Sequence, residues 1–129
     1  MILTDRLCLA AFVVFAAATG LFLLGAPHAF YADVPGVAAA GAFDAHLLRD
    51  VGLTYMTLAG GVVMALIRPS WMLPVTSMAA LYLGCHAAIH ALMELAAPRG
   101  TNVLAEMPGV YLPALLACGL VVRARCAGY

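Results

Sequence analysis

Four long apolar runs follow one another along the chain, and each is about as long as a membrane-spanning helix. They cover residues 7–24, 46–67, 71–95 and 104–122, and Pro, Gly and charged residues separate them. A helix needs about 20 mainly apolar residues to cross a bilayer core. We therefore predict an all-α polytopic membrane protein, a single domain built as an antiparallel bundle of four transmembrane helices.

Composition supports a lipid environment. Hydrophobic residues make up 66% of the chain and charged residues only 9%. A soluble protein of this size needs more polar surface than that. The six basic residues are balanced by six acidic ones and form no basic stretch, so nucleic-acid binding is excluded. The lipid bilayer is the first partner that the sequence predicts.

The arginines predict the orientation of the bundle. Four arginines lie on one side of the predicted membrane, and Arg99 lies in a short loop on the other side. The four are Arg6, Arg68, Arg123 and Arg125. Basic residues are enriched in cytoplasmic loops. We expect a multi-pass protein of the inner (plasma) membrane with both termini in the cytoplasm.

The polar residues inside the spans gather in the outer half of the predicted bundle. The second span opens with His46, Arg49 and Asp50, and the third carries His86, His90 and Glu94. A charged side chain in hydrocarbon costs a few kcal/mol, so each needs a partner or a function. The spacings within each span place these groups along one helix face.

A reversal near Pro69 allows the depths of the two spans to be compared. Equal residue counts from the turn give equal rises, so His86 should lie level with Gly52 and His90 with Leu48. We interpret Gly52 as space for the His86 imidazole, because glycine has no side chain.

The depth match predicts one contiguous site. Its members are His46, Asp50, His86 and His90, flanked by an Arg49–Glu94 ion pair and by Glu106 at the outer end of the fourth span. We expect loss of Asp50 to lower stability more than loss of Asp44 at the helix mouth.

Three interpretations of this site remain open. The first is a structural network that fixes helix register. The second is a transition-metal site, in which imidazole and carboxylate ligands suit Zn, Cu, Fe or Mn. Haem is disfavoured, because its axial ligands must approach from opposite faces. The third is metal-free acid–base catalysis on a lipid or quinone.

The connection at residues 26–45 is long for a compact bundle. We predict that it folds as a lid over the polar site with Tyr31 or Asp33 facing inward, and that Pro27, Pro35 and Gly36 prevent regular helix there. The alternative is an interfacial segment that rests on lipid headgroups.

The start of the second span resembles a known family. Residues 43–55, with Arg49, Gly52 and Tyr55 at the outer start of a helix, are similar to small bacterial four-helix membrane proteins of the DoxX-like kind. The resemblance implies a helical bundle and association with a membrane redox complex, but no established reaction. The histidines of the third span lie outside it.

Two classes of function follow from these patterns. The first is an accessory or assembly subunit that docks to other membrane subunits or to further copies of itself, with a polar cluster that holds a metal or is structural. The second is a membrane-embedded metal-dependent oxidoreductase or other enzyme that acts on a lipid or quinone at the outer leaflet.

Overall fold

The computed structural model describes residues 1–96 and 103–129, and the regular structure of this part is entirely helical. Four of its helical stretches are long and apolar enough to cross a membrane, which confirms the predicted all-α four-helix fold. The long helices are α1 (Leu3–Gly25), α4 (Ala45–Ile67), α5 (Met72–Ala96) and α7 (Leu112–Cys126).

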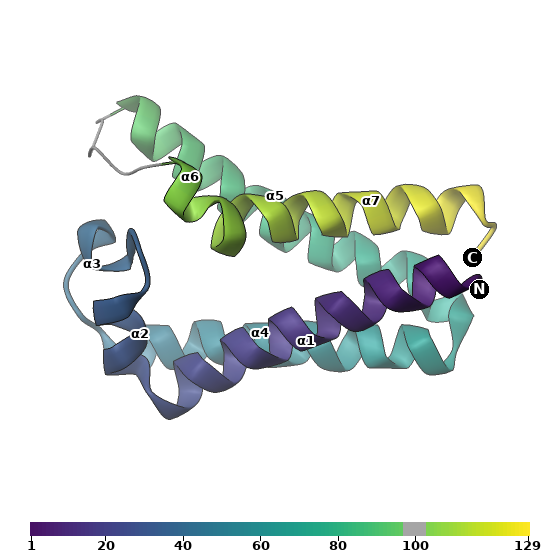
Figure 1. Ribbon diagram of the computed structural model, residues 1–129, viewed down its shortest axis with the longest axis horizontal. Coiled ribbons are helices and arrows are strands. Elements are labelled where there is room, and N and C mark those ends of the chain that lie inside the picture. Colours follow the sequence, from purple (N-terminus) through teal and green to yellow (C-terminus); the bar gives the residue numbers. More distant parts are fainter. Residues whose placement is uncertain (97–102) are drawn as a thin grey trace.

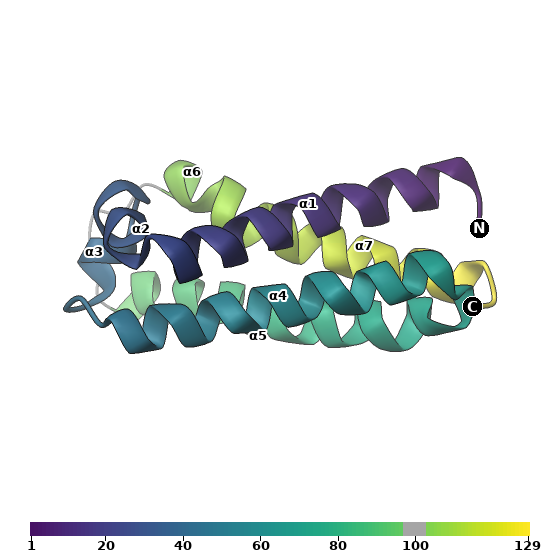
Figure 2. The ribbon, with the colours of Figure 1, turned by 90° about the horizontal axis from the view of Figure 1, so that it is seen from below.

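The long helices pair as two hairpins. Helix α1 packs mainly against α4, and α5 mainly against α7 (Figure 1). Both chain termini lie at one end of the molecule, which we call the terminal end, and the hairpins approach each other there. They diverge toward the opposite end, called the loop end, which holds the short helices α2, α3 and α6. Figure 2 shows the same arrangement after a quarter turn.

A tight turn at the terminal end joins the hairpins. Helix α4 ends at Ile67, and the 3-10 turn η1 (Pro69–Trp71) leads directly into α5. Pro69 explains this end, because proline disfavours helical backbone at the preceding residue. The reversal thus lies where the sequence predicts it.

At the loop end, two short helices connect α1 to α4. They are α2 (Pro27–Asp33) and α3 (Val37–Ala40). The expectation that prolines exclude regular helix here is wrong for Pro27, which is the first residue of α2. Proline is well tolerated at that position, because the first amide of a helix has no partner within the helix. Gly36 separates α2 from α3 with a φ of +86°.

The last span begins irregularly. Helix α6 (Val103–Glu106) passes into the π-helical segment η2 (Met107–Tyr111), which contains Pro108, and then into α7. Arg99, which the orientation argument placed in the second outer loop, lies outside the described residues.

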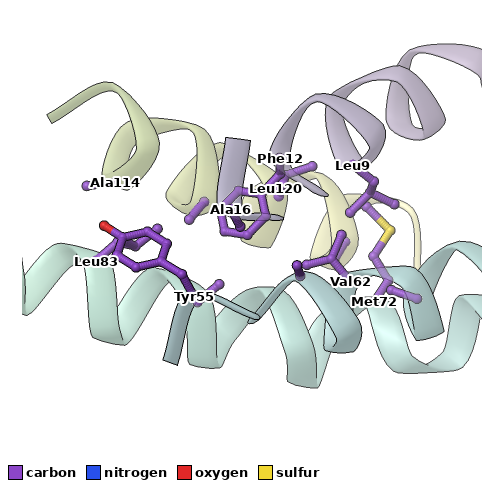
Figure 3. Packing of buried hydrophobic residues seen from close by; sticks show 14 of the residues in the cluster. Leu9, Phe12, Ala16, Tyr55, Val62, Met72, Leu83, Ala114 and Leu120 are labelled. Carbon is purple, nitrogen blue, oxygen red and sulfur yellow. The ribbon is translucent and has the colours of Figure 1, made fainter. Parts of the chain in front are cut away.

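The core holds the two hairpins together through small and aliphatic side chains. Figure 3 shows Phe12 and Ala16 of α1 near Leu120 of α7, and Tyr55 of α4 reaching toward Leu83 and Ala114 of the second hairpin. The buried cluster combines side chains from all four long helices. Alanines such as Ala16, which is 0% exposed, allow the close helix approach that is common in membrane bundles.

Candidate functional site

Two histidines lie one turn apart near the loop end of α5. The ring centres of His86 and His90 are 4.7 Å apart in an edge-to-face arrangement, and both residues are half-buried. Tyr82, one turn nearer the terminal end, lies parallel to His86 with ring centres 6.4 Å apart. The i, i+4 spacing places these three side chains on one face of the helix.

Glu106 brings a carboxylate to these histidines from the start of the last span. His90 Nδ1 lies 3.3 Å from Glu106 Oε2, and the Glu106 side chain is only 11% exposed. Glu106 ends α6 immediately before the π-helical segment. Such π turns occur frequently at functional sites. Glu106, predicted only to flank the site, is therefore the direct partner of His90.

The connection between α1 and α4 reaches the same carboxylate through Gly36. A Cβ atom at Gly36 would lie 2.9 Å from Glu106 Oε1, so the backbone of this connection lies directly against Glu106. The two residues predicted to face inward do not make this contact. The Tyr31 hydroxyl donates a hydrogen bond to the Gly41 carbonyl at 2.9 Å, and Asp33 is exposed.

Tyr55 continues the line of rings into the first hairpin. Its ring centre lies 6.2 Å from that of Tyr82, and the residue is only 5% exposed. Tyr55, Tyr82, His86 and His90 thus form an unbroken series of ring contacts, which we call the aromatic row. The row runs from the core to the loop end and meets Glu106 there.

The other two predicted site residues lie on the outside of α4. His46 Nδ1 is 3.7 Å from Asp50 Oδ1, and the side chains are 88% and 56% exposed. The opposite face of α4, with Gly52 and Tyr55, is the one that packs in the core. The four predicted residues therefore form two pairs instead of one site, and in the described part of the chain no hydrogen bond or ion pair joins the pairs.

The predicted metal site does not fit this arrangement. Within residues 1–96 and 103–129, no group of three or more His, Cys, Asp and Glu side chains could hold a metal ion. A zinc site usually needs at least three protein ligands. His46 and Asp50, which are half of the predicted ligand set, are exposed on the outside of α4.

The interpretation of Gly52 as space for the His86 imidazole is wrong. A Cβ atom on Gly52 would lie 2.9 Å from Leu23 Cβ and 3.1 Å from the Gly20 carbonyl oxygen. Gly52 therefore lets α4 approach the backbone of α1, not α5.

The predicted Arg49–Glu94 ion pair is not among the ion pairs of the described residues. Arg49 is exposed on the same outward side of α4 as His46 and Asp50.

An ion pair at the terminal end was not predicted. Arg123 donates from Nε and Nη2 to Asp5 Oδ1, at 3.0 and 2.8 Å. The Asp5 side chain is 2% exposed and borders a cavity of about 270 Å³ between α1 and α7, lined mainly by apolar side chains. A carboxylate at the start of an apolar helix was the available signal, because it needs a cation nearby.

The comparisons with known proteins identify no relative. No family model matches the chain, and no curated protein or solved structure is similar to it at a significant level. The function is therefore inferred from the side chains themselves, chiefly from the cluster of His86, His90 and Glu106.

Proposed function

We propose that the protein is an accessory subunit of a membrane complex and that it binds the headgroup of a quinone or a similar neutral amphiphile at His86, His90 and Glu106. One observation carries the proposal: a nearly buried carboxylate pairs with a half-buried imidazole at one end of a transmembrane hairpin. Buried polar groups in membrane spans are costly and usually functional.

The chemistry of the cluster selects the ligand class. An imidazole N–H donates to a carbonyl oxygen, and a carboxylate accepts from a hydroxyl group. A quinone offers the first group and a quinol the second. An anionic headgroup is disfavoured beside Glu106, since a phosphate is normally bound by arginine or lysine.

The accessory role is supported by the amount of helix surface that the bundle leaves open. Only 22–28% of the most apolar window of each span is buried inside the protein. The remainder is available to lipids and to neighbouring transmembrane helices. The resemblance of residues 43–55 to DoxX-like proteins points in the same direction, toward a membrane redox complex.

The proposal includes a location in a bacterial inner membrane with both termini in the cytoplasm. The two termini lie at the same end of the molecule (Figure 1). The helix ends and the turn at this end contain Arg6, Arg68, Arg123 and Arg125. An excess of arginine at one end favours a cytoplasmic position for it. The cluster at the loop end would then face outward.

The aromatic row favours a second candidate function. Tyr82 and Tyr55 continue inward from the histidines, so groups able to exchange protons follow one another from the cluster into the core. This arrangement would suit an enzyme that acts on a quinone or lipid at the outer leaflet.

Photolabelling tests the proposed site. The purified protein in lipid nanodiscs is irradiated with a photoreactive short-chain quinone, and labelled residues are located by mass spectrometry. We expect labelling near the loop end of α5 that falls at least tenfold in His90→Ala and Glu106→Gln. His46→Ala is the matched control, since His46 is 88% exposed on α4, and it should label like the wild type.

Other outcomes separate the alternatives. Equal labelling of all variants would refute the site, and preferential binding of a lipophilic cation would refute the ligand class. Stoichiometric metal in the wild type that His90→Ala removes would favour the metal interpretation instead. Steady-state turnover of a quinol with an added electron acceptor would favour the enzyme over the accessory subunit.

A further inference from the structure

One face of α4 is exposed over the whole length of the helix. Residues on it recur at helical spacing and are exposed within the part of the chain that the structure describes. We call it the α4 face and define it by Arg49, Asp50, Leu53, Thr57, Gly60 and Ile67. The opposite side of the same helix packs in the core through Tyr55, Ala59 and Val62.

Two opposite charges lie next to each other at the loop end of this face. Arg49 makes no ion pair and no side-chain hydrogen bond with the described residues, and Asp50 contacts His46 at 3.7 Å while 56% exposed. Asp50 lies six residues beyond the N-cap Asp44, or about 9 Å along the axis. A long arginine reaches back toward the headgroups, but an aspartate is too short to do so.

The middle of the α4 face holds the small residues Thr57 and Gly60, and the Thr57 hydroxyl already has a hydrogen-bond partner. The Thr57 hydroxyl donates to the Leu53 carbonyl at 2.9 Å, so it needs no further partner. A Cβ atom on Gly60 would meet none of the described residues within 4 Å, so these residues leave open space there. A second helix could therefore approach closely without leaving polar groups unpaired.

We propose that the α4 face is a homodimer interface in which Arg49 pairs with Asp50 of the partner subunit, and Asp50 with Arg49 of the partner subunit. Adjacent residues of opposite charge lie at nearly the same depth. A two-fold axis along the membrane normal therefore brings each charge next to its opposite on the other copy. Charge complementarity thus selects a second copy of this chain. A lipid phosphate would pair with Arg49 but repel Asp50.

Charge reversal tests the pairing. Dimerisation is measured in liposomes by energy transfer between labelled copies, over a range of protein-to-lipid ratios. Arg49→Asp places two aspartates on each copy, and Asp50→Arg places two arginines there. Each single reversal should weaken dimerisation at least tenfold. The double variant Arg49→Asp/Asp50→Arg restores opposite charges across the axis and should recover most of the affinity.

Cysteine cross-linking tests the location of the interface. Native Cys8, Cys85, Cys118 and Cys126 are first replaced by alanine. Leu53→Cys and Gly60→Cys should then form disulfide-linked dimers on mild oxidation in membranes. Leu115→Cys is the control, because Leu115 is 63% exposed on α7, outside the α4 face.

Each alternative result has a defined meaning. Cross-linking through Leu115→Cys but not through Leu53→Cys would place the interface elsewhere and overturn the proposal. So would a double reversal that dimerises no better than the single reversals. If a reversed variant loses its helical circular dichroism, Arg49→Gln and Asp50→Asn replace it, and dimerisation of both at wild-type strength would again overturn the proposal.

Discussion

Asp5 and Arg123 lie 118 residues apart in the chain and join the first long helix to the last at the terminal end. Both Nε and Nη2 of Arg123 donate to the same carboxylate oxygen, at 3.0 and 2.8 Å. Asp5 Oδ2 also accepts from the Ile2 backbone amide at 3.4 Å, so this side chain closes the start of α1 as well. The pair therefore adds a charged link at the terminal end to the apolar core contacts that hold the two hairpins together.

Breaking this pair should destabilise the bundle. In Arg123→Ala the Asp5 carboxylate, 2% exposed in the wild type, loses the cation that donates hydrogen bonds to it. Because a buried charge without its partner is destabilising, we expect Arg123→Ala to lower the thermal unfolding midpoint of the detergent-solubilised protein. Arg125→Ala is the control, because Arg125 is exposed in the same helical turn. Asp5→Asn/Arg123→Gln should lose less than the two single changes added together.

The contact between Gly20 and Gly52 should tolerate no side chain. A Cβ atom on Gly20 would lie 2.9 Å from the Gly52 carbonyl oxygen, and backbone cannot move aside as a flexible side chain can. Overpacking of this kind typically costs about 1–3 kcal/mol. Gly20→Ala should thus lower the unfolding midpoint. Gly84→Ala should not, because a Cβ atom there would meet none of the residues that the structure describes within 4 Å. Equal effects of both variants would contradict the close approach of Gly20 and Gly52.

The sequence predicts well how deep each residue lies along its span, but it does not predict which helix each side chain faces. It places Gly52 level with His86, and the contact between Tyr55 and Tyr82 agrees with this register to within one residue. Both spans are apolar on nearly every side, so periodicity does not distinguish the face that meets another helix from the face that meets lipid. From the sequence alone, the charged residues of α4 are therefore grouped with His86 and His90.

The partner of each residue depends on how helices pair in space. Matching the depths of consecutive spans predicts a polar site between the second and the third, whereas α5 packs mainly against α7. That pairing makes Glu106 the partner of His90. The π-helical turn that follows Glu106 could not be inferred from apolar periodicity, although Pro108 and Gly109 indicate an irregular helix start.

The contacts of Asp44 and Asp50 favour the opposite order of importance from the one expected from the sequence. Asp44 Oδ1 accepts from the backbone amides of His46 and Leu47, at 2.9 and 3.1 Å, and so caps the start of α4. Replacing an N-cap by alanine typically costs about 1 kcal/mol. Hydrogen exchange of the His46 and Leu47 amides should accelerate in Asp44→Ala. Asp50→Ala should leave both rates unchanged, and acceleration by Asp50→Ala alone would support the original expectation.

The contact of Gly36 with Glu106 joins the connection between α1 and α4 to the cluster of His86, His90 and Glu106. Gly36 has a φ of +86°, a conformation that costs other residues about 1–2 kcal/mol. An added Cβ would also press on Glu106 Oε1 at 2.9 Å. Gly36→Ala should therefore loosen α3 and displace the Glu106 carboxylate from His90.

Hydrogen exchange measures this coupling from both sides. The Ala40 amide donates to the Gly36 carbonyl at 3.1 Å and reports on α3. We expect its exchange to accelerate in Gly36→Ala and also in Glu106→Ala, which removes the opposite half of the contact. Gly41→Ala is the matched control, since Gly41 has an extended backbone and a Cβ atom there would meet no described residue within 4 Å. If Glu106→Ala leaves the Ala40 amide as protected as in the wild type, the connection does not depend on the cluster and the predicted lid is excluded.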